Sequence, residues 1–137
     1  STTVLILFNY DNGEKDVVFP LPDEEHYGEI ALRGMSTMVP ALSTYLDKGL
    51  KPYVDGGYYM KTRENRQLIG PTAIEGVFLS CAYSGFGIMS SMAGGELAAR
   101  HMLGLSLPEY APAFLLTRYQ DPGYRTLLAN WGDGGQL

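Results

Sequence analysis

The segment between residues 76 and 104 constrains the fold most, because a glycine turn joins a strand to a helix there. Residues 76–82 form a short apolar run that predicts a strand, and Ser84-Gly85-Phe86-Gly87 follows it. Apolar residues then recur at helical spacing until Gly104, a natural helix end. A helix start exposes N–H groups and carries partial positive charge, and glycines let a planar or anionic ligand approach them. The segment therefore predicts a ligand-binding turn.

The residues before this segment predict a β-hairpin and a helix pair. Residues 3–20 hold two β-rich runs around Asn12-Gly13, a dipeptide that favours a hairpin turn. Apolar residues from Tyr27 to Leu46 recur at three- and four-residue steps, which predicts one apolar helical stripe. Pro40 divides this run, because proline lacks a backbone donor and clashes with the preceding turn.

The first strand after the helix pair is predicted at residues 53–60, and the segment Leu68-Ile69-Gly70-Pro71 stands between it and the strand at 76–82. The first is interrupted by Gly56-Gly57, which is typical of a bulge or of a close approach of a ligand to the backbone. After Leu107 no periodic pattern is visible, but the tail is too aromatic for a free linker and is expected to pack against something. The fold class is therefore α+β. We divide the chain into residues 1–60, residues 61–104 and residues 105–137.

Composition excludes several classes of function. Ten basic residues are scattered among fifteen acidic ones, which gives a net charge of −5 and argues against nucleic-acid binding. No apolar run has the length of a membrane span. The single cysteine, Cys81, excludes an internal disulfide and a cysteine-based zinc site, so no metal is expected. A reducing intracellular compartment is compatible with this cysteine usage, although the sequence assigns no location.

Hydrolytic chemistry has little support. Ser84 lacks the glycine that a nucleophile elbow requires two positions earlier, because Ala82 stands there. Cys81 lies in an apolar strand, where a free cysteine usually behaves as a small hydrophobic residue. Neither histidine has a partner at ligand spacing. No catalytic acid, base or nucleophile is assigned.

The sequence resembles the C-terminal part of FAD-dependent oxidoreductases of the D-amino acid oxidase superfamily, in the glycine/sarcosine oxidase-like branch. The resemblance spans about residues 25–137. It is carried by the order and spacing of four segments: the run from Asp55 to Pro71, the strand 76–82, the turn 84–87 and the ending from Leu107 to Pro122.

The resemblance implies a non-covalent FAD site and a substrate site. The backbone of Ser84, Gly85, Phe86, Gly87, Ile88 and Met89 would face the pyrimidine end of the flavin ring. Amide donors there would stabilise the negative charge of reduced flavin. Tyr59, with Tyr58, would face the substrate, although a tyrosine that only covers the core is an equal alternative. Arg66 would bind a substrate carboxylate, or else pair with Glu64 on the surface.

Three departures limit the resemblance. Met89 stands where relatives that oxidise small amino acids often carry a carboxylate-binding lysine. Gly57 stands where some relatives attach flavin through a cysteine. The dinucleotide-binding fingerprint Gly-x-Gly-x-x-Gly is missing, since Ser90 occupies the third glycine position after Gly85-Phe86-Gly87. We therefore expect this chain to work with an N-terminal FAD-binding part or a companion chain.

The expected function is oxidation of an amine or amino acid by hydride transfer to flavin N5, with this chain as the C-terminal portion or small subunit. Its first strands would belong to the substrate-side antiparallel sheet, and the strand and helix around the glycine turn to the FAD-binding domain. The alternative is a catalytically silent scaffold subunit that keeps the oxidoreductase fold. A third reading, from length alone, is an independent small α+β binding domain.

Overall fold

A computed structural model describes residues 3–7, 16–21, 26–49 and 52–132 of the chain. The chain divides into two compact units, residues 1–58 and residues 59–137. Among the described residues, no helix combines the length and hydrophobicity that a membrane crossing requires.

The first unit contains the predicted helix pair, α1 (Tyr27–Met38) and the 3-10 helix η1 (Pro40–Tyr45). The division at Pro40 is confirmed. Val39 separates the two helices with φ −125° and ψ 84°, outside the helical region. The cause is steric, because the residue before a proline is disfavoured in the α conformation.

The strands predicted in this unit are wrong where the structure describes them. Residues 3–7, 16–18 and 53–60 have no strand assignment, and the hairpin turn lies outside the described residues. Their apolar side chains are open to solvent, with Leu5 94% and Tyr53 93% exposed. A strand is stable only when its neighbours complete a sheet and cover one face, and the described part of this unit supplies neither.

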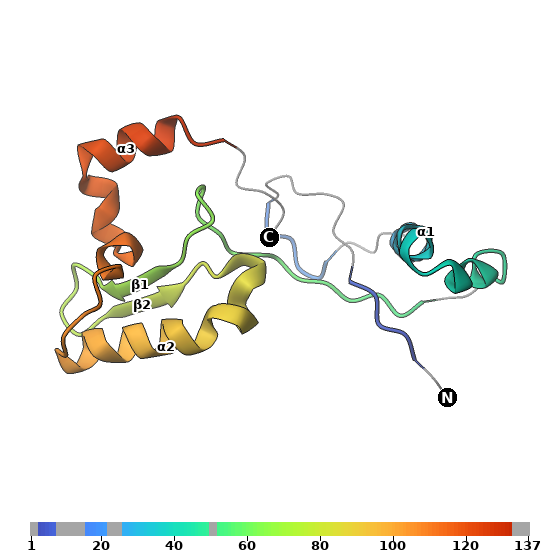
Figure 1. Cartoon of the computed structure of the whole chain (residues 1–137), viewed down its shortest axis with the longest axis horizontal. Helices are drawn as coiled ribbons and strands as arrows, with labels where there is room; N and C mark the ends of the chain where they lie inside the picture. The colour runs from blue at the N-terminus through green and yellow to red at the C-terminus, as the bar shows by residue number, and fades with distance from the viewer. Residues whose placement is uncertain (1–2, 8–15, 22–25, 50–51, 133–137) are drawn as a thin grey trace. The chain divides into compact units, whose positions relative to one another are not determined.

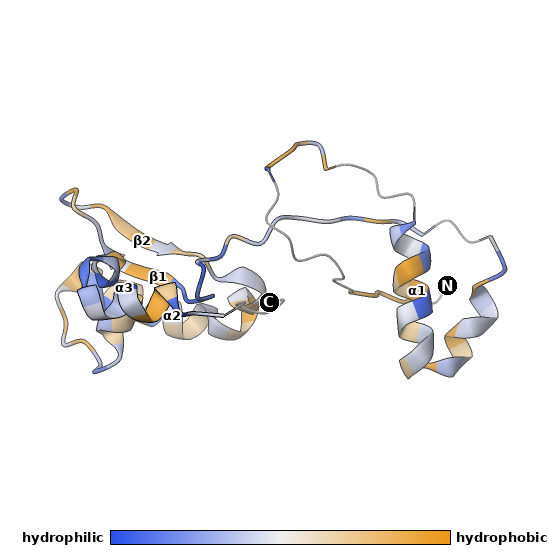
Figure 2. Ribbon diagram, turned by 90° about the horizontal axis from the view of Figure 1, so that it is seen from above, coloured by the Kyte–Doolittle hydropathy of each residue, from blue (hydrophilic) through white to orange (hydrophobic). Residues whose placement is uncertain are grey.

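The second unit contains a two-stranded antiparallel sheet, β1 (Leu68–Pro71) and β2 (Phe78–Cys81). Leu68 pairs with Cys81, and Pro71 pairs with Phe78. The strand predicted at residues 76–82 is thus confirmed with shorter bounds, and its partner strand is residues 68–71. Figure 2 shows hydrophobic residues along both strands. With several helices beside this sheet, the chain is a small α+β protein.

Helix α2 (Gly87–Leu103) follows the glycine turn, as predicted. Gly104 ends it in the left-handed conformation with φ 63°, a conformation that glycine adopts without steric cost. The helix packs on the sheet through a small core that joins α2, β1 and the chain beyond α2. Its members are Ile69, Leu97, Ala98 and Ala111.

The C-terminal segment has more regular structure than its sequence predicted. Two 3-10 helices, η3 (Ala111–Phe114) and η4 (Leu116–Gln120), precede α3 (Pro122–Ala129). Asp121 caps α3 by accepting a hydrogen bond from the Tyr124 N–H at 2.8 Å. The 3-10 helices contact β1, so this part of the aromatic tail packs against the sheet of its own unit. In Figure 1, α2 and α3 lie on opposite sides of the hairpin.

Candidate functional site

The glycine turn begins with an unusual backbone. Ala82 and Ser84, on either side of Tyr83, have φ values of 59° and 53°. The left-handed conformation costs a non-glycine residue about 1–2 kcal/mol. Such residues persist only where the surrounding structure holds them, and they cluster at functional sites. The backbone therefore marks this turn as the first place to look for a binding function.

Three contacts hold the turn in this conformation. The Tyr83 hydroxyl hydrogen-bonds the Ser80 hydroxyl at 2.8 Å. Gly94 of α2 lies against the Tyr83 ring, so closely that a Cβ at Gly94 would collide with the Tyr83 hydroxyl. The Ser84 N–H donates to the Met60 carbonyl at 3.0 Å. The turn is thus fixed to the strand before it, to the helix after it and to the segment that follows Tyr59.

The start of α2 lacks a cap of its own. The turn continues as the 3-10 helix η2 (Ser84–Phe86), and Phe86, at the N-cap position, makes no side-chain cap hydrogen bond. A Cβ on Gly87 would meet only the Tyr83 Cβ, at 3.8 Å. The Ser84 hydroxyl oxygen is shielded from solvent without a hydrogen-bond partner in the described structure. A helix start without a side-chain cap, a missing Cβ and an unsatisfied hydroxyl fit a flat ligand with an electron-rich edge.

Apolar side chains surround this helix start on its open side. Ile88 is 95% exposed and Met92 is 85% exposed, and Met89 between them is exposed as well. Large apolar residues gathered on one helical turn are typical of a surface that another molecule covers. The first two turns of α2 therefore combine hydrogen-bond donors with an apolar surround.

The three predicted substrate residues, Tyr58, Tyr59 and Arg66, have different surroundings in the structure. Tyr59 is exposed and precedes Met60, whose carbonyl holds the turn. Tyr58 belongs to the first unit, where its hydroxyl donates to the Val18 carbonyl at 3.1 Å and accepts from the Val18 N–H at 3.0 Å. Arg66 lies half-buried beside the C-terminal segment, and no hydrogen bond among the described residues joins it to either tyrosine. Within the second unit, the structure thus ties the residue after Tyr59 to the turn.

A buried cluster around Glu64 is the feature that sequence reasoning missed. The Glu64 Oε1 atom accepts from Arg118 Nη2 at 2.6 Å and from Arg118 Nε at 3.0 Å. It also accepts from the hydroxyls of Tyr119, at 2.9 Å, and Tyr124, at 2.8 Å. The side chains of Glu64 and Arg118 are only 1% and 3% exposed. The alternative that Glu64 pairs with Arg66 on the surface is therefore wrong.

Burial and hydrogen bonding act in opposite directions on the cluster's ionisable groups. Burial raises the pKa of Glu64, but hydrogen bonds from its own backbone N–H, Tyr124, Tyr119 and Arg118 outweigh it and leave the pKa below its ordinary value. Burial and the hydrogen bond to Glu64 raise the pKa of Tyr119 and of Tyr124. The carboxylate and both phenols therefore keep the charge states of an ion pair with two neutral donors.

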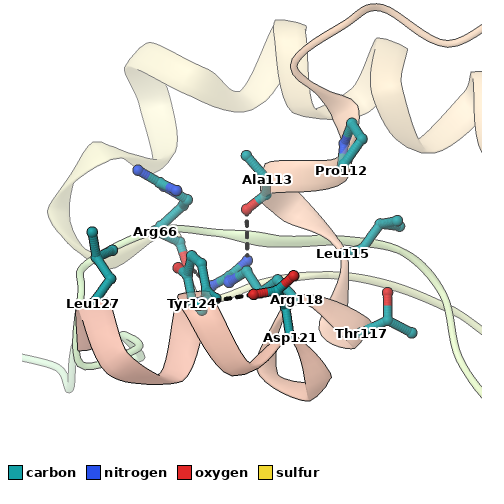
Figure 3. Close-up of a pocket in the computed structure, with 10 residues that line it drawn as sticks. Arg66, Pro112, Ala113, Leu115, Thr117, Arg118, Asp121, Tyr124 and Leu127 are labelled. Carbon is teal, nitrogen blue, oxygen red and sulfur yellow. Dashed lines mark hydrogen bonds between the residues drawn. The ribbon is translucent and has the colours of Figure 1, made fainter. Parts of the chain in front are cut away.

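A pocket of about 530 Å³ lies over this cluster, between the C-terminal segment and Arg66. Figure 3 shows Arg118 behind Tyr124, with Arg66 and Leu127 on one side and Leu115 and Thr117 on the other. Arg118 is fully engaged with Glu64 and backbone carbonyls, so it offers this pocket no free charge. Within the described ranges, no group of histidine, cysteine and carboxylate side chains could hold a metal ion.

The fold and the turn define a small α+β unit with an uncapped helix start at a strained glycine turn. Comparisons add no relative to this description: no family model matches the chain, and no curated protein or solved structure matches it either.

Proposed function

We propose that this chain is the C-terminal part, or the small subunit, of an FAD-dependent oxidoreductase that oxidises an amine or amino acid. The proposal rests on the resemblance of residues 25–137 to the D-amino acid oxidase superfamily, and the geometry of the second unit supports it. One observation carries most weight: the hydrogen bond from the Ser84 N–H to the Met60 carbonyl, 3.0 Å long. It keeps the residue after Tyr59 beside the glycine turn.

When bound, FAD supplies the hydride acceptor for oxidation of a C–H bond next to nitrogen. The backbone from Ser84 to Met89, with the positive end of the α2 dipole, would face the electron-rich edge of the ring and favour its negative charge. The Ser84 and Phe86 N–H groups already donate to the Met60 and Tyr83 carbonyls, so the donors to the ring would be other amides of this segment. Gly87 leaves room for close approach, and Tyr59 would line the substrate side. Tyr58 would contact the substrate only after releasing its hydrogen bonds to Val18, and Arg66 only after leaving its place beside the C-terminal segment.

A second chain, or a preceding part of the same protein, is needed to hold the adenosine end of the cofactor. The exposed apolar residues at the start of α2, Ile88, Met89 and Met92, suit contact with that partner, because burial of such side chains stabilises an interface. The exposed apolar side chains of the first unit suit burial against a partner in the same way. The same surfaces would suit the rival function, a silent scaffold subunit, so exposure alone does not separate the two.

Flavin content separates them. The tagged full chain is recovered from its own cells with its companion, and the cofactor released by denaturation is measured by absorbance and mass spectrometry. We expect FAD equimolar with the chain. Gly87→Val should abolish flavin binding and leave the companion bound, because valine meets only the Tyr83 Cβ in this chain but obstructs a ring lying on the turn.

Gly95→Val is the matched control, since Gly95 lies in the same helix and a Cβ there meets nothing within 4 Å. This variant should keep both flavin and companion. A wild-type complex that holds its companion without flavin would refute the enzyme and favour the scaffold. If the wild type is free of flavin and Gly87→Val also loses the companion, the scaffold is favoured further. A chain that is monomeric, cooperatively folded and flavin-free would favour an independent binding domain.

A further inference from the structure

A continuous series of hydrogen bonds runs from the C-terminal segment to the glycine turn. Arg118 Nη1 donates to the Gln67 carbonyl at 2.8 Å, and Nη2 donates to the Arg66 carbonyl at 3.0 Å. The Gln67 side-chain amide donates to the Ser90 hydroxyl at 3.3 Å. Ser90 in turn donates to the Phe86 carbonyl at 2.7 Å. Phe86 lies in the turn itself, one residue before Gly87.

The first link in this series is held firmly. The guanidinium of Arg118 is planar and is anchored through two nitrogens to Glu64, so its remaining N–H groups have fixed directions. Those N–H groups fix the backbone of residues 66 and 67. Because Glu64 and Arg118 are almost fully buried, water does not compete for these bonds.

The second link has a defined polarity. The Ser90 hydroxyl accepts from Gln67 and uses its only proton for the Phe86 carbonyl. A donor that polarises the hydroxyl strengthens the bond that the hydroxyl donates. The position of the Gln67 amide therefore bears directly on the first turn of α2, although Gln67 lies before the hairpin in the chain.

We propose that Arg118 is a positioning residue for the glycine turn, acting through Gln67 and Ser90. The C-terminal segment, which makes no direct hydrogen bond to the turn among the described residues, would in this way set the geometry of the turn. This inference depends on the proposed function only for the identity of the ligand that the turn binds. It goes beyond that function by naming residues outside the turn that determine how rigidly the turn is held.

Hydrogen exchange at single amides of the full chain, followed by NMR, tests the series without any cofactor. The Phe86 amide donates to the Tyr83 carbonyl inside the turn, so its exchange reports how easily the turn opens. Gln67→Ala and Ser90→Ala should each speed this exchange about 2- to 10-fold, because each removes one neutral hydrogen bond from the series that holds the Phe86 carbonyl. Ser90→Thr keeps a hydroxyl that can bond the same carbonyl, so it should restore slow exchange. Amides around Ile69 and Leu97 in the core should exchange as in the wild type.

Ser91→Ala is the matched control. Its hydroxyl bonds the Ile88 carbonyl at 3.1 Å, a bond of the same kind as that of Ser90, but without a link to Gln67. It should leave the Phe86 amide within twofold of the wild type. If Ser91→Ala and Ser90→Ala act equally, the effect belongs to the helix alone and the proposal is overturned.

The role of Arg118 is tested by combining changes. Arg118→Lys keeps the charge but loses the planar fork, so it should speed exchange at Phe86 by a similar factor. In a chain that already carries Gln67→Ala, Arg118→Lys should not speed exchange of the Phe86 amide any further. An equal effect in both backgrounds would overturn the proposal. If Arg118→Lys does not fold, Glu64→Asp provides the second variant, because it withdraws the anchor by one methylene and should show the same dependence on Gln67.

The outcome is separable from that of the proposed function. Exchange rates are read on the chain alone, so a failed series leaves flavin binding untouched. A chain that never binds flavin can still show the coupling among Arg118, Gln67 and Ser90.

Discussion

Replacement of Glu64 by glutamine should destabilise the second unit severely. Glutamine has the shape of glutamate, and its oxygen can occupy the position where Oε1 accepts four hydrogen bonds. Its NH2 group then takes the position of Oε2, which has no partner and is shielded from solvent. The Arg118 guanidinium is left buried without a counter-charge. The change therefore removes charge while it keeps volume.

The size of the effect follows from burial. Removal of one partner of a buried ion pair costs about 3–5 kcal/mol, whereas an exposed pair contributes about 0.2–1 kcal/mol. Domains of this size are stable by about 4–12 kcal/mol, so Glu64→Gln should remove a large share of the free energy of unfolding. Glu96→Gln is the matched control, because Glu96 pairs with Arg100 four residues later on the open side of α2 and is 64% exposed. It should cost less than about 0.5 kcal/mol.

Urea unfolding of the full chain, followed by far-UV circular dichroism and by the fluorescence of Trp131, measures both variants. The midpoint should fall strongly for Glu64→Gln and hardly move for Glu96→Gln. Equal midpoints for the two variants would refute the reasoning, because they would mean that the Glu64 carboxylate is as well solvated as an exposed one.

Two further outcomes are expected. Because the pKa of Glu64 is lowered in the folded chain, its contribution to stability is present above about pH 4.3 and is lost as pH falls through the folded pKa. The pKa values of Tyr119 and Tyr124 are raised in the folded chain. Their contributions to stability are therefore complete below about pH 10 and are lost as pH rises through the folded pKa values. Thermal unfolding across pH should therefore show both edges, and a Glu64→Gln variant that retained an unchanged acid edge would contradict this assignment. Gly94→Ala should lower the free energy of unfolding by about 1–3 kcal/mol, because the new Cβ collides with the Tyr83 hydroxyl. In Gly95→Ala the new Cβ meets nothing within 4 Å, so this variant should gain up to about 1 kcal/mol from helix propensity. Stabilisation by both changes in urea titrations would be inconsistent with close packing at Gly94.

Local patterns predicted the parts of the fold whose causes are local. The break at Pro40, the helix end at Gly104 and the turn before Gly87 each follow from backbone restrictions of one residue, and each was confirmed. The predicted hairpin and the strand at 53–60 failed in the described residues because a strand depends on a partner that the local pattern does not specify. The α3 helix was missed although Asp121 and Pro122 are a recognisable cap and first position.

The sequence likewise predicted only part of the candidate site. The turn could be located from its glycines, but the left-handed backbone at Ala82 and Ser84 could not, because neither residue type favours it. The pairing of Glu64 with Arg118 was not predictable either. Charged residues are usually solvated, and Arg66 was the nearer partner in sequence. A carboxylate in a predicted loop and an arginine among tyrosines in the tail were the only signals available.

The distance along the chain between the two buried charges has a consequence for how the protein is made. Glu64 leaves the ribosome well before Arg118, which lies 54 positions later in the order of synthesis. Until that arginine emerges, the nascent hairpin and α2 cannot enclose the carboxylate without stranding a charge in a nonpolar interior. Closure of this unit must therefore wait until Arg118 has emerged, and a ribosome stalled before that point would display an open, hydrated hairpin to chaperones and proteases.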